Sequence, residues 1–503
     1  MSLSIIHTRA QFGIDAPQVI VEVHISKGLP SLSMVGLPEL AVRESKERVR
    51  SALINSGFEF PMRRVTINLA PADLPKQGGR YDLAIAIGIL LATGQIDGAE
   101  IQSSEFVGEL ALTGELRPVS GILPTAIACR KHQQTLFIAK ENAEEASLAD
   151  DTQIYAASNL NELCQHLKGV VRLCPLSYVV RKDLDHGLPD LSDVKGQAQA
   201  RRALEVSAAG RHNLLFYGPP GTGKSMLASR LPGILPSLNK LQVVDVASVY
   251  SLAGLSRDSK QLFSAPFRSP HHTASSVALV GGGSDPKPGE ISLAHLGVLF
   301  LDELPEFGRS VLEVLREPIE SGEIRISRAK AAVTFPANFQ LLAAMNPCPC
   351  GYLGHPKIAC TDSPQQINQY RRKLSGPLLD RFDLHIEVAF QPGSVLLGKS
   401  AAAESSSVVY ERVVQARKRQ LDRQHKLNSE LSPDELQQFC ALKPETQTLL
   451  EAAMDKLALS ARGAHRVIRV ARTLADLQGM EQIDASYITE ALAYRGLDRK
   501  SGV

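Results

Sequence analysis

The sequence has little net charge and no long apolar run. Its 55 Lys and Arg residues nearly balance its 53 Asp and Glu residues, which leaves a formal net charge of +2. A chain that coats nucleic acid carries a large positive excess, so any nucleic-acid contact here must be local, such as a lined channel. The longest apolar run, "LAIAIGILLATG" at 83–94, is too short to span a bilayer and predicts a buried helix.

Signals for export are also missing. The start "MSLSIIHTRAQFG" lacks the basic residues and long apolar core of a signal peptide. Seven cysteines, an odd number in a long chain, do not indicate a disulfide framework. We therefore expect a cytoplasmic protein without membrane contact.

The chain of 503 residues is long enough for two to four domains. Residues 1–168 mix strand and helix patterns and contain no nucleotide-binding loop. Residues 169–190 show no clear period, contain two prolines and read as a linker. Strands and helices alternate over 191–393, and residues 394–503 follow helical patterns. The predicted fold class is α/β.

A phosphate-binding loop is the most specific motif. "GPPGTGKS" follows a predicted strand and precedes a predicted helix, as the GxxxxGK[ST] pattern requires. Its backbone N–H groups would surround phosphate oxygens. Lys224 would reach the β- and γ-phosphates of ATP, and the Ser225 hydroxyl would bind Mg²⁺. The predicted loop residues are Gly218, Pro219, Pro220, Gly221, Thr222, Gly223, Lys224 and Ser225.

Polar residues end two later strands. "GVLFLDELPEF" (297–307) ends its apolar run at Asp302 and Glu303, and "QLLAAMNP" (340–347) ends at Asn346. Ligands of open α/β sheets bind at such strand ends. Asp302 would hold Mg²⁺ through water, Glu303 would polarise the attacking water, and Asn346 would orient that water or sense the γ-phosphate. A helix N-cap and a strand-end turn are the plain alternatives.

Arginines follow these strands. Arg381 lies between Asp380 and Asp383, which allows a structural ion pair or a finger that reaches the ATP of a neighbouring subunit. Arg462 and Arg466 begin a helix pattern at 459–477, and one of them, preferentially Arg466, would contact the γ-phosphate. A further basic helix, 410–426, reads as a solvated face or a nucleic-acid contact.

The stretch "SGEIRISRAKAAVTF" (321–335) alternates apolar and polar residues on both sides of a basic tip, which predicts a hairpin. Its basic residues are Arg325, Arg328 and Lys330. By itself this tip could be a solvated turn.

Three cysteines crowd into "NPCPCGYLGHPKIACTD". Clustered thiolates in a reducing compartment indicate a structural Zn²⁺ site more than a disulfide. Cys348, Cys350 and Cys360 would supply three ligands, and Asp362 or His355 the fourth; the alternative is a proline-rich loop with free thiols.

Taken in order, these motifs resemble an AAA+ ATPase, a P-loop core followed by a helical lid. "RSPHHTASSVALVGGG" and "PKPGEISLAHLGVLFLDELPEF" resemble the magnesium-chelatase-like branch over about 191–500. "GLPSLSMVGLPELAVRESKERVRSAL" resembles the amino-terminal domain of the ComM/YifB family, an α+β domain similar to the Lon protease domain (ribosomal S5 domain 2-like). The Lon serine and lysine are replaced here by Arg80 and Leu123, so we expect no peptidase activity.

The resemblance implies a homo-hexameric, ATP-driven helicase or translocase that uses ATP and Mg²⁺. It would act on single-stranded and branched DNA and promote branch migration in homologous recombination during natural transformation, together with a recombinase or other recombination proteins. It also implies that Lys330 stands at the tip of a pore hairpin, which suits a phosphate backbone. The alternatives are a magnesium-chelatase-type motor that remodels a protein partner and an ATP-gated DNA-binding scaffold.

Overall fold

The computed structural model describes residues 2–36, 40–98, 100–177, 187–283, 286–328, 331–397 and 403–497. The chain divides into two compact units. The first comprises residues 1–182 with 243–258 and 325–335, and the second comprises 183–242, 259–324 and 336–503. Within the described residues, no helix has the length and apolar character needed to cross a membrane.

The first unit is built on a mixed seven-stranded sheet with the order β3-β4-β2-β1-β5-β8-β9. β1, β2 and β4 pair antiparallel, whereas β3 with β4, and β1, β5, β8 and β9 in succession, pair parallel. Alternate residues of β2 and β4 are buried, the pattern of strands with one covered face. The strands are β1 (Ser2–Arg9), β2 (Gln18–Ser26), β3 (Ser31–Val35), β4 (Arg64–Ala70), β5 (Ser104–Phe106), β8 (Thr135–Ala139) and β9 (Ile154–Ala157), with a small hairpin of β6 (Glu109–Leu110) and β7 (Leu116–Arg117).

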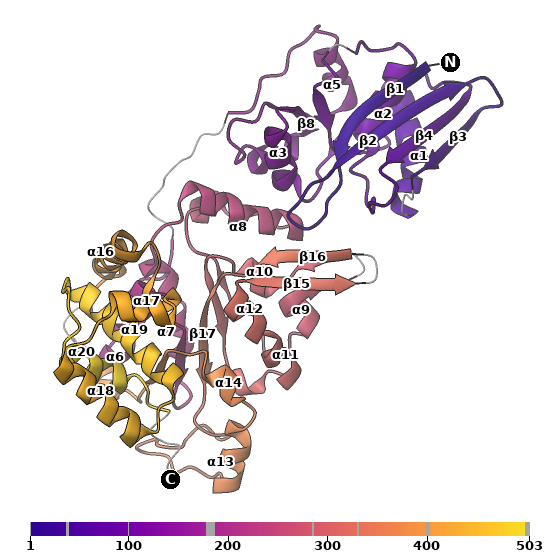
Figure 1. Cartoon of the computed structure of the whole chain (residues 1–503). Coiled ribbons are helices and arrows are strands. Elements are labelled where there is room, and N and C mark those ends of the chain that lie inside the picture. The colour runs from indigo at the N-terminus through magenta and orange to yellow at the C-terminus, as the bar shows by residue number, and fades with distance from the viewer. Residues whose placement is uncertain are drawn as a thin grey trace. The chain divides into compact units, whose positions relative to one another are not determined.

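The apolar run at 83–94 forms the predicted buried helix. This helix, α2 (Asp82–Ala92), packs on β1 and β2, as Figure 1 shows. Gly88 makes the close approach possible, because a Cβ there would lie 2.7 Å from the Val23 side chain. The other helices of residues 1–182 are α1 (Leu40–Asn55), α3 (Ile122–Lys131), α4 (Ala143–Ala146), α5 (Leu160–Leu167) and a 3₁₀ turn (Lys140–Asn142).

Two segments from later in the chain belong to the same unit. They are most of α8 (Lys240–Ala253) and the hairpin of β15 (Glu323–Arg328) and β16 (Ala331–Pro336). The Gly121 N–H donates to the Ser251 carbonyl at 3.0 Å, and a Cβ on Gly13 would meet the Val333 side chain at 2.6 Å. The predicted hairpin is therefore present.

The second unit contains a parallel five-stranded sheet with the order β11-β14-β17-β10-β18. β10, β14 and β17 are buried along their whole length, as expected of strands covered on both faces. The strands are β10 (Leu214–Tyr217), β11 (Phe267–Arg268), β14 (Val298–Leu301), β17 (Gln340–Met345) and β18 (Leu384–Glu387), and a separate pair is formed by β12 (Gly281–Gly282) and β13 (Lys287–Pro288).

Helices of this unit precede, connect and follow the strands. Those before residue 398 are α6 (Ala198–Gly210), α7 (Lys224–Ala228), α9 (Ser276–Val280), α10 (Glu290–Leu293), α11 (Arg309–Val314), α12 (Arg316–Ser321), α13 (Pro364–Arg371), α14 (Gly376–Leu379) and α15 (Gly393–Leu397), with 3₁₀ turns at Leu191–Asp193, Leu231–Ile234, Ser259–Gln261 and Leu304–Glu306. Those after it are α16 (Ser406–Gln424), α17 (Pro433–Phe439), α18 (Pro444–Leu457), α19 (Ala461–Gln478) and α20 (Ala485–Ala493), with a 3₁₀ turn at Asn428–Glu430. In Figure 1 the later helices form one orange-to-yellow group, of which α16 and α19 contact α6.

The basic helix predicted at 410–426 is, as far as Gln424, the C-terminal part of α16. Its interpretation as a solvated face is wrong for Arg412, Arg417 and Arg423, which are only partly exposed. Arg412 pairs with Glu205 at 2.5 Å, and Arg417 donates to the Ala208 carbonyl at 2.6 Å. Burial lowers the pKa of Arg417 to about 9. Arg419 and Arg423 donate to the backbone and the carboxylate of Asp476.

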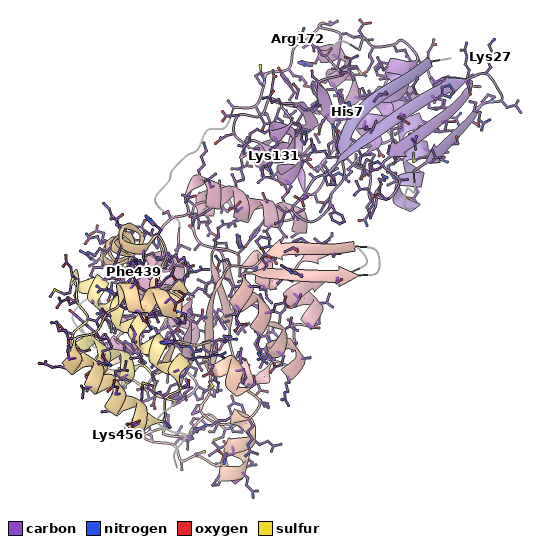
Figure 2. All side chains as sticks on the ribbon, viewed as in Figure 1. His7, Lys27, Lys131, Arg172, Phe439 and Lys456 are labelled. Carbon is purple, nitrogen blue, oxygen red and sulfur yellow. The ribbon has the colours of Figure 1, made fainter. Side chains whose placement is uncertain are left out.

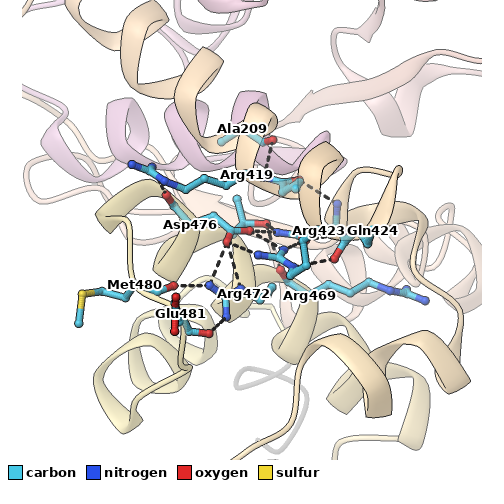
Figure 3. Close-up of polar contacts among 12 residues, drawn as sticks. Ala209, Arg419, Arg423, Gln424, Arg469, Arg472, Asp476, Met480 and Glu481 are labelled. Atoms are coloured by element: carbon cyan, nitrogen blue, oxygen red, sulfur yellow. Dashed lines mark hydrogen bonds and ion pairs between the residues drawn. The ribbon is translucent and has the colours of Figure 1, made fainter.

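Asp476 is the centre of this polar network (Figure 3). Its carboxylate is 1% exposed and accepts from Arg423 at 2.7 Å, Arg472 at 2.9 Å and Asn428 at 2.8 Å. A buried carboxylate with several charged donors stabilises the fold only as long as every partner stays in place.

We expect Asp476→Ala to destabilise the protein by about 3 kcal/mol, since the buried Arg472 guanidinium would lose its counter-charge. The measurement is the thermal unfolding midpoint of the full chain. Lys443→Ala is the matched control: it breaks an exposed pair with Asp484 at 3.0 Å and should cost under about 1 kcal/mol. Equal shifts for the two variants would contradict the role given to Asp476.

Candidate ATP site

The phosphate loop leaves the sheet beside the strand that carries Asn346. Tyr217 pairs with Met345 in the parallel register of β10 and β17, so Gly218 and Asn346 follow side by side. Gly218 has a φ of 155°, and a Cβ there would lie 2.4 Å from the Val388 carbonyl oxygen, so the turn requires glycine. Gly223, also at positive φ, begins α7.

Lys224 lies inside this loop. Its Nζ donates to the carbonyls of Gly218 and Pro219, both at 2.8 Å, and to Asn346 Oδ1 at 3.1 Å. Burial lowers the pKa of Lys224 to about 8, although Asp302 and Glu303 act in the opposite direction. The ammonium is thus held where a bound phosphate would meet it, in contact with the residue predicted to sense that phosphate.

Ser225 and Asp302 meet at the same edge of the sheet. Ser225 Oγ donates to Asp302 Oδ2 at 2.5 Å, and the Glu303 N–H donates to Asp302 Oδ1 at 2.9 Å. A hydroxyl and a carboxylate are the oxygen ligands that Mg²⁺ takes in nucleotide sites. These residues therefore fit the Mg²⁺ ion that accompanies ATP.

Glu303 stands next to this pair in an unusual backbone conformation. Its φ of 52° places a non-glycine residue in the left-handed region, a local strain that is common at functional sites. Glu303 Oε2 lies 3.2 Å from Nδ1 of His272, from the segment before α9. The sequence analysis assigned no role to His272, whose only signal is its place in "RSPHHTASS".

The predicted arginines gather at another place in this unit. Arg381 pairs with Glu320 of α12. Its pKa is lowered by burial and by the nearby charges of Arg466, Arg462 and Arg316. Several positive side chains therefore surround Arg381, as they do on surfaces that bind anions.

Arg466, on α19, is 8% exposed and lies 3.6 Å from Asp380 and 3.7 Å from Asp383. The acidic neighbours of Arg381 in the sequence thus contact Arg466. The structure brings the two predicted arginine features into one cluster, which the sequence did not indicate.

Of the predicted DNA-contacting residues, Lys330 lies outside the described residues. Arg325 and Arg328 stand on β15, the first strand of the hairpin. The second strand, β16, ends four residues before β17 begins, and Asn346 directly follows β17. Chain connectivity therefore links the hairpin directly to the ATP site.

In the first unit, Arg80 and Leu123, the two positions at which a Lon-like serine and lysine are expected to be missing, are buried. Arg80 is 5% exposed and donates to Thr125 Oγ1 at 2.9 Å and Gln11 Oε1 at 3.3 Å. Lys76 donates to the Gly36 carbonyl, and Leu123 is fully buried. The side chains of Arg80 and Lys76 therefore make their contacts inside this unit.

The cysteines predicted to bind metal lie together. Sγ of Cys348, Cys350 and Cys360 and a carboxylate oxygen of Asp362 all lie within 4.8 Å of one another. His355 Nδ1 instead accepts from the backbone N–H groups of Lys357 and Ile358. Of the two fourth ligands considered, the structure favours Asp362.

Comparison with known proteins agrees with this geometry. Family models described as magnesium chelatase, subunit ChlI; subunit ChlI of Mg-chelatase; and magnesium chelatase, subunit ChlI C-terminal match residues 190–395, 21–142 and 403–495. The magnesium-chelatase 38 kDa subunit of Cereibacter sphaeroides is 24% identical over 39% of this chain and 58% of its own. Fold and site thus define a magnesium-chelatase-like AAA+ protein, a class that uses ATP with Mg²⁺.

Two relatives match along the whole chain. The competence protein ComM of Haemophilus influenzae is 51% identical over 99% of this chain and 98% of its own. YifB of Escherichia coli is also 51% identical, with the same coverage. The chain belongs to the ComM/YifB family.

The lowered pKa of Lys224 predicts that MgATP binding weakens as pH rises. The charged amine is the form that binds phosphate, so above pH of about 8 the protein must take up a proton, and Kd should rise about tenfold per pH unit. Calorimetric titrations between pH 7.5 and 9.5 measure this slope. Lys224→Arg, which stays charged throughout, should give a flat profile; a flat profile for the unaltered protein would contradict the assignment.

The position of Glu303 predicts that Glu303→Gln binds MgATP with a Kd within about threefold of the unaltered protein but hydrolyses it at least about 100-fold more slowly. The amide keeps the shape of the side chain but cannot accept a proton from water. Equilibrium binding and single-turnover hydrolysis separate the two effects. Glu306→Gln, which only weakens an exposed contact with Lys373, is the control. Normal hydrolysis by Glu303→Gln would remove Glu303 from the reaction.

Proposed function

We propose that this protein is an ATP-driven DNA helicase or translocase that promotes branch migration during homologous recombination in natural transformation. The observation that carries the proposal is the chain path from the ATP site into the basic hairpin. Asn346, whose side-chain oxygen accepts a hydrogen bond from Lys224, directly follows β17, and β17 begins four residues after β16 of that hairpin ends. If loss of the γ-phosphate displaces Asn346, the displacement would pass along β17 to the hairpin.

The reaction uses the site residues in distinct roles. Lys224 and the loop N–H groups would bind the phosphates, and Ser225 and Asp302 would hold a Mg²⁺ ion, which would supply positive charge against the charge that develops on the phosphate. Glu303 takes a proton from the attacking water, and His272, at 3.2 Å, steers its carboxylate. The role of Asn346 is to register whether the γ-phosphate is present.

The proposed assembly is a ring of six copies. Arg381 lies in an arginine cluster with Arg462 and Arg466, and its partner in the isolated chain is Glu320. In the ring, Arg381 would contact the ATP of the neighbouring subunit instead of Glu320. It would there stabilise the negative charge of the transition state. Residues 394–503 would act as the helical lid, and residues 1–168 as a Lon-like domain without peptidase activity.

The proposed ligand of the ring is DNA, single-stranded or branched, and recombination proteins are the proposed partners. Six hairpins, each with Arg325, Arg328 and Lys330, would line a channel with positive charge. Binding through phosphates is independent of base sequence and weakens with salt. The name of the Haemophilus relative, a competence protein, supports the proposed role in natural transformation.

The test is ATP hydrolysis with and without single-stranded and branched DNA. We expect stimulation of about tenfold or more at low salt, falling steeply as salt rises, and loss of stimulation in Lys330→Ala. The control is Lys456→Ala, an exposed lysine on α18 that Figure 2 labels, which should be stimulated normally. Hydrolysis that no DNA stimulates would contradict the proposal and favour a chelatase-type motor acting on a protein. ATP binding without sustained turnover on DNA would favour a scaffold.

A further inference from the structure

The loop between β17 and α13 contains a cluster that the ATP reaction does not use. It runs from Asn346 to Ser363 without a helix or strand. Loops of this length inside a compact unit are uncommon unless something holds them. Here the chain folds back so that Cys348 and Cys350 meet Cys360 and Asp362.

The three sulfur atoms form a nearly equilateral triangle. The Sγ–Sγ distances are 3.4 Å for Cys348–Cys350, 3.6 Å for Cys348–Cys360 and 3.5 Å for Cys350–Cys360. A tetrahedral Zn²⁺ with Zn–S bonds of about 2.3 Å would set its sulfur ligands about 3.8 Å apart. The observed triangle is a few tenths of an ångström smaller, so it needs little expansion to accept the ion.

A disulfide does not account for the triangle. All three Sγ–Sγ distances far exceed the bond length of about 2.05 Å, and the three thiols are free. Pairing any two of them would also leave the third without a partner.

The carboxylate of Asp362 completes the set. Its Oδ2 lies 3.8 Å from Cys360 Sγ and accepts the Cys350 N–H at 2.8 Å. A Zn²⁺ ion with three thiolates and one carboxylate would place sulfur and oxygen about 3.5 Å apart. The backbone N–H orients the carboxylate as outer-shell donors orient metal ligands.

We propose that Cys348, Cys350, Cys360 and Asp362 form a structural Zn²⁺ site. Three thiolates and a carboxylate suit zinc rather than Mg²⁺, which requires oxygen ligands in an octahedral arrangement. Four protein ligands leave no open position for catalysis. Cys348 is fully buried and the other three are partly buried, so the ion would sit just beneath the surface of the loop.

A metal ion at this site would hold the phosphate loop in place. The consequence for nucleotide binding rests on the proposed ATP reaction. Gly351, at a φ of 83°, directly follows Cys350. A Cβ on Gly351 would lie 2.8 Å from Pro220 Cδ and 3.8 Å from Asn346 Cγ. The turn at the metal therefore packs against both the phosphate loop and the residue that contacts Lys224.

The first experiment measures metal in the full-length chain, purified under reducing conditions without a polyhistidine tag. We expect about one zinc ion per chain, and loss of it in Cys360→Ser. Cys174→Ser is the matched control, since Cys174 is an exposed thiol outside the cluster. A zinc-free chain, or zinc that persists in Cys360→Ser but is lost in Cys174→Ser, would overturn the proposal.

Two further measurements complete the test. The first uses the unaltered chain and so does not depend on a variant that folds, and the second identifies the fourth ligand. In the unaltered chain, titration with a mercurial should release zinc as the cluster thiols are modified; release without thiol loss contradicts the site. After Co²⁺ replacement, the visible bands should show a tetrahedral thiolate site, and Asp362→Cys should shift them toward those of a four-thiolate site. Unchanged bands would exclude Asp362 as a ligand.

The effect of zinc on the affinity for MgATP is measured in a separate experiment. Zinc removal should weaken MgATP binding severalfold, and zinc restoration should recover it. If zinc is lost on substitution of the cysteines but the Kd for MgATP stays constant, the metal site stands and its coupling to the phosphate loop is refuted. Failure of DNA to stimulate hydrolysis would leave the metal result unaffected.

Discussion

The parallel register of β10, β14 and β17 is the constraint on which the rest of the ATP site depends. Parallel strands of one sheet end at a common edge. Tyr217 aligns with Met345 and Leu301 with Ala343, so the residues that follow each strand emerge at the same edge. There Lys224 donates to Asn346 and Ser225 donates to Asp302. A slip of one residue in any pair would turn Asp302 or Asn346 away from Lys224. Because both faces of the three strands are covered, such a slip would be costly: every side chain would have to repack against the opposite layer.

Local sequence patterns predicted the elements that carry this edge. The glycine loop and the two apolar strands with polar ends each lie within about twenty residues, and their residue spacing is typical of one local structure. The hairpin, in the other unit, was predictable in the same way. The buried helix α2 was predictable for the same reason, since its apolar run leaves no solvated face. Short patterns of this kind need no knowledge of the rest of the chain.

Features that depend on distant contacts were not predictable. The pairing of His272 with Glu303 joins a loop to a strand end thirty-one positions later, and nothing in either segment marks the other. The arginines of α16 have the composition of a solvated face, yet Arg417 and Arg423 bind α6 and α19. The choice of Asp362 over His355 as the fourth member of the cysteine cluster likewise required the fold of the loop. Long arginine side chains can serve either solvent or a buried acceptor, and only packing decides.

The division of the chain into units does not follow the order of the sequence. The backbone passes from one unit to the other after residues 182, 242, 258, 324 and 335. A truncation after residue 182 would separate residues 1–182 from α8 and the hairpin, and would remove the Ser251 carbonyl that accepts the Gly121 N–H and the Val333 side chain beside Gly13. The two halves of such a cut would each expose surfaces that the intact chain covers. The first unit is therefore assembled from three separate stretches of the chain, and residues 1–182 alone do not contain all of it.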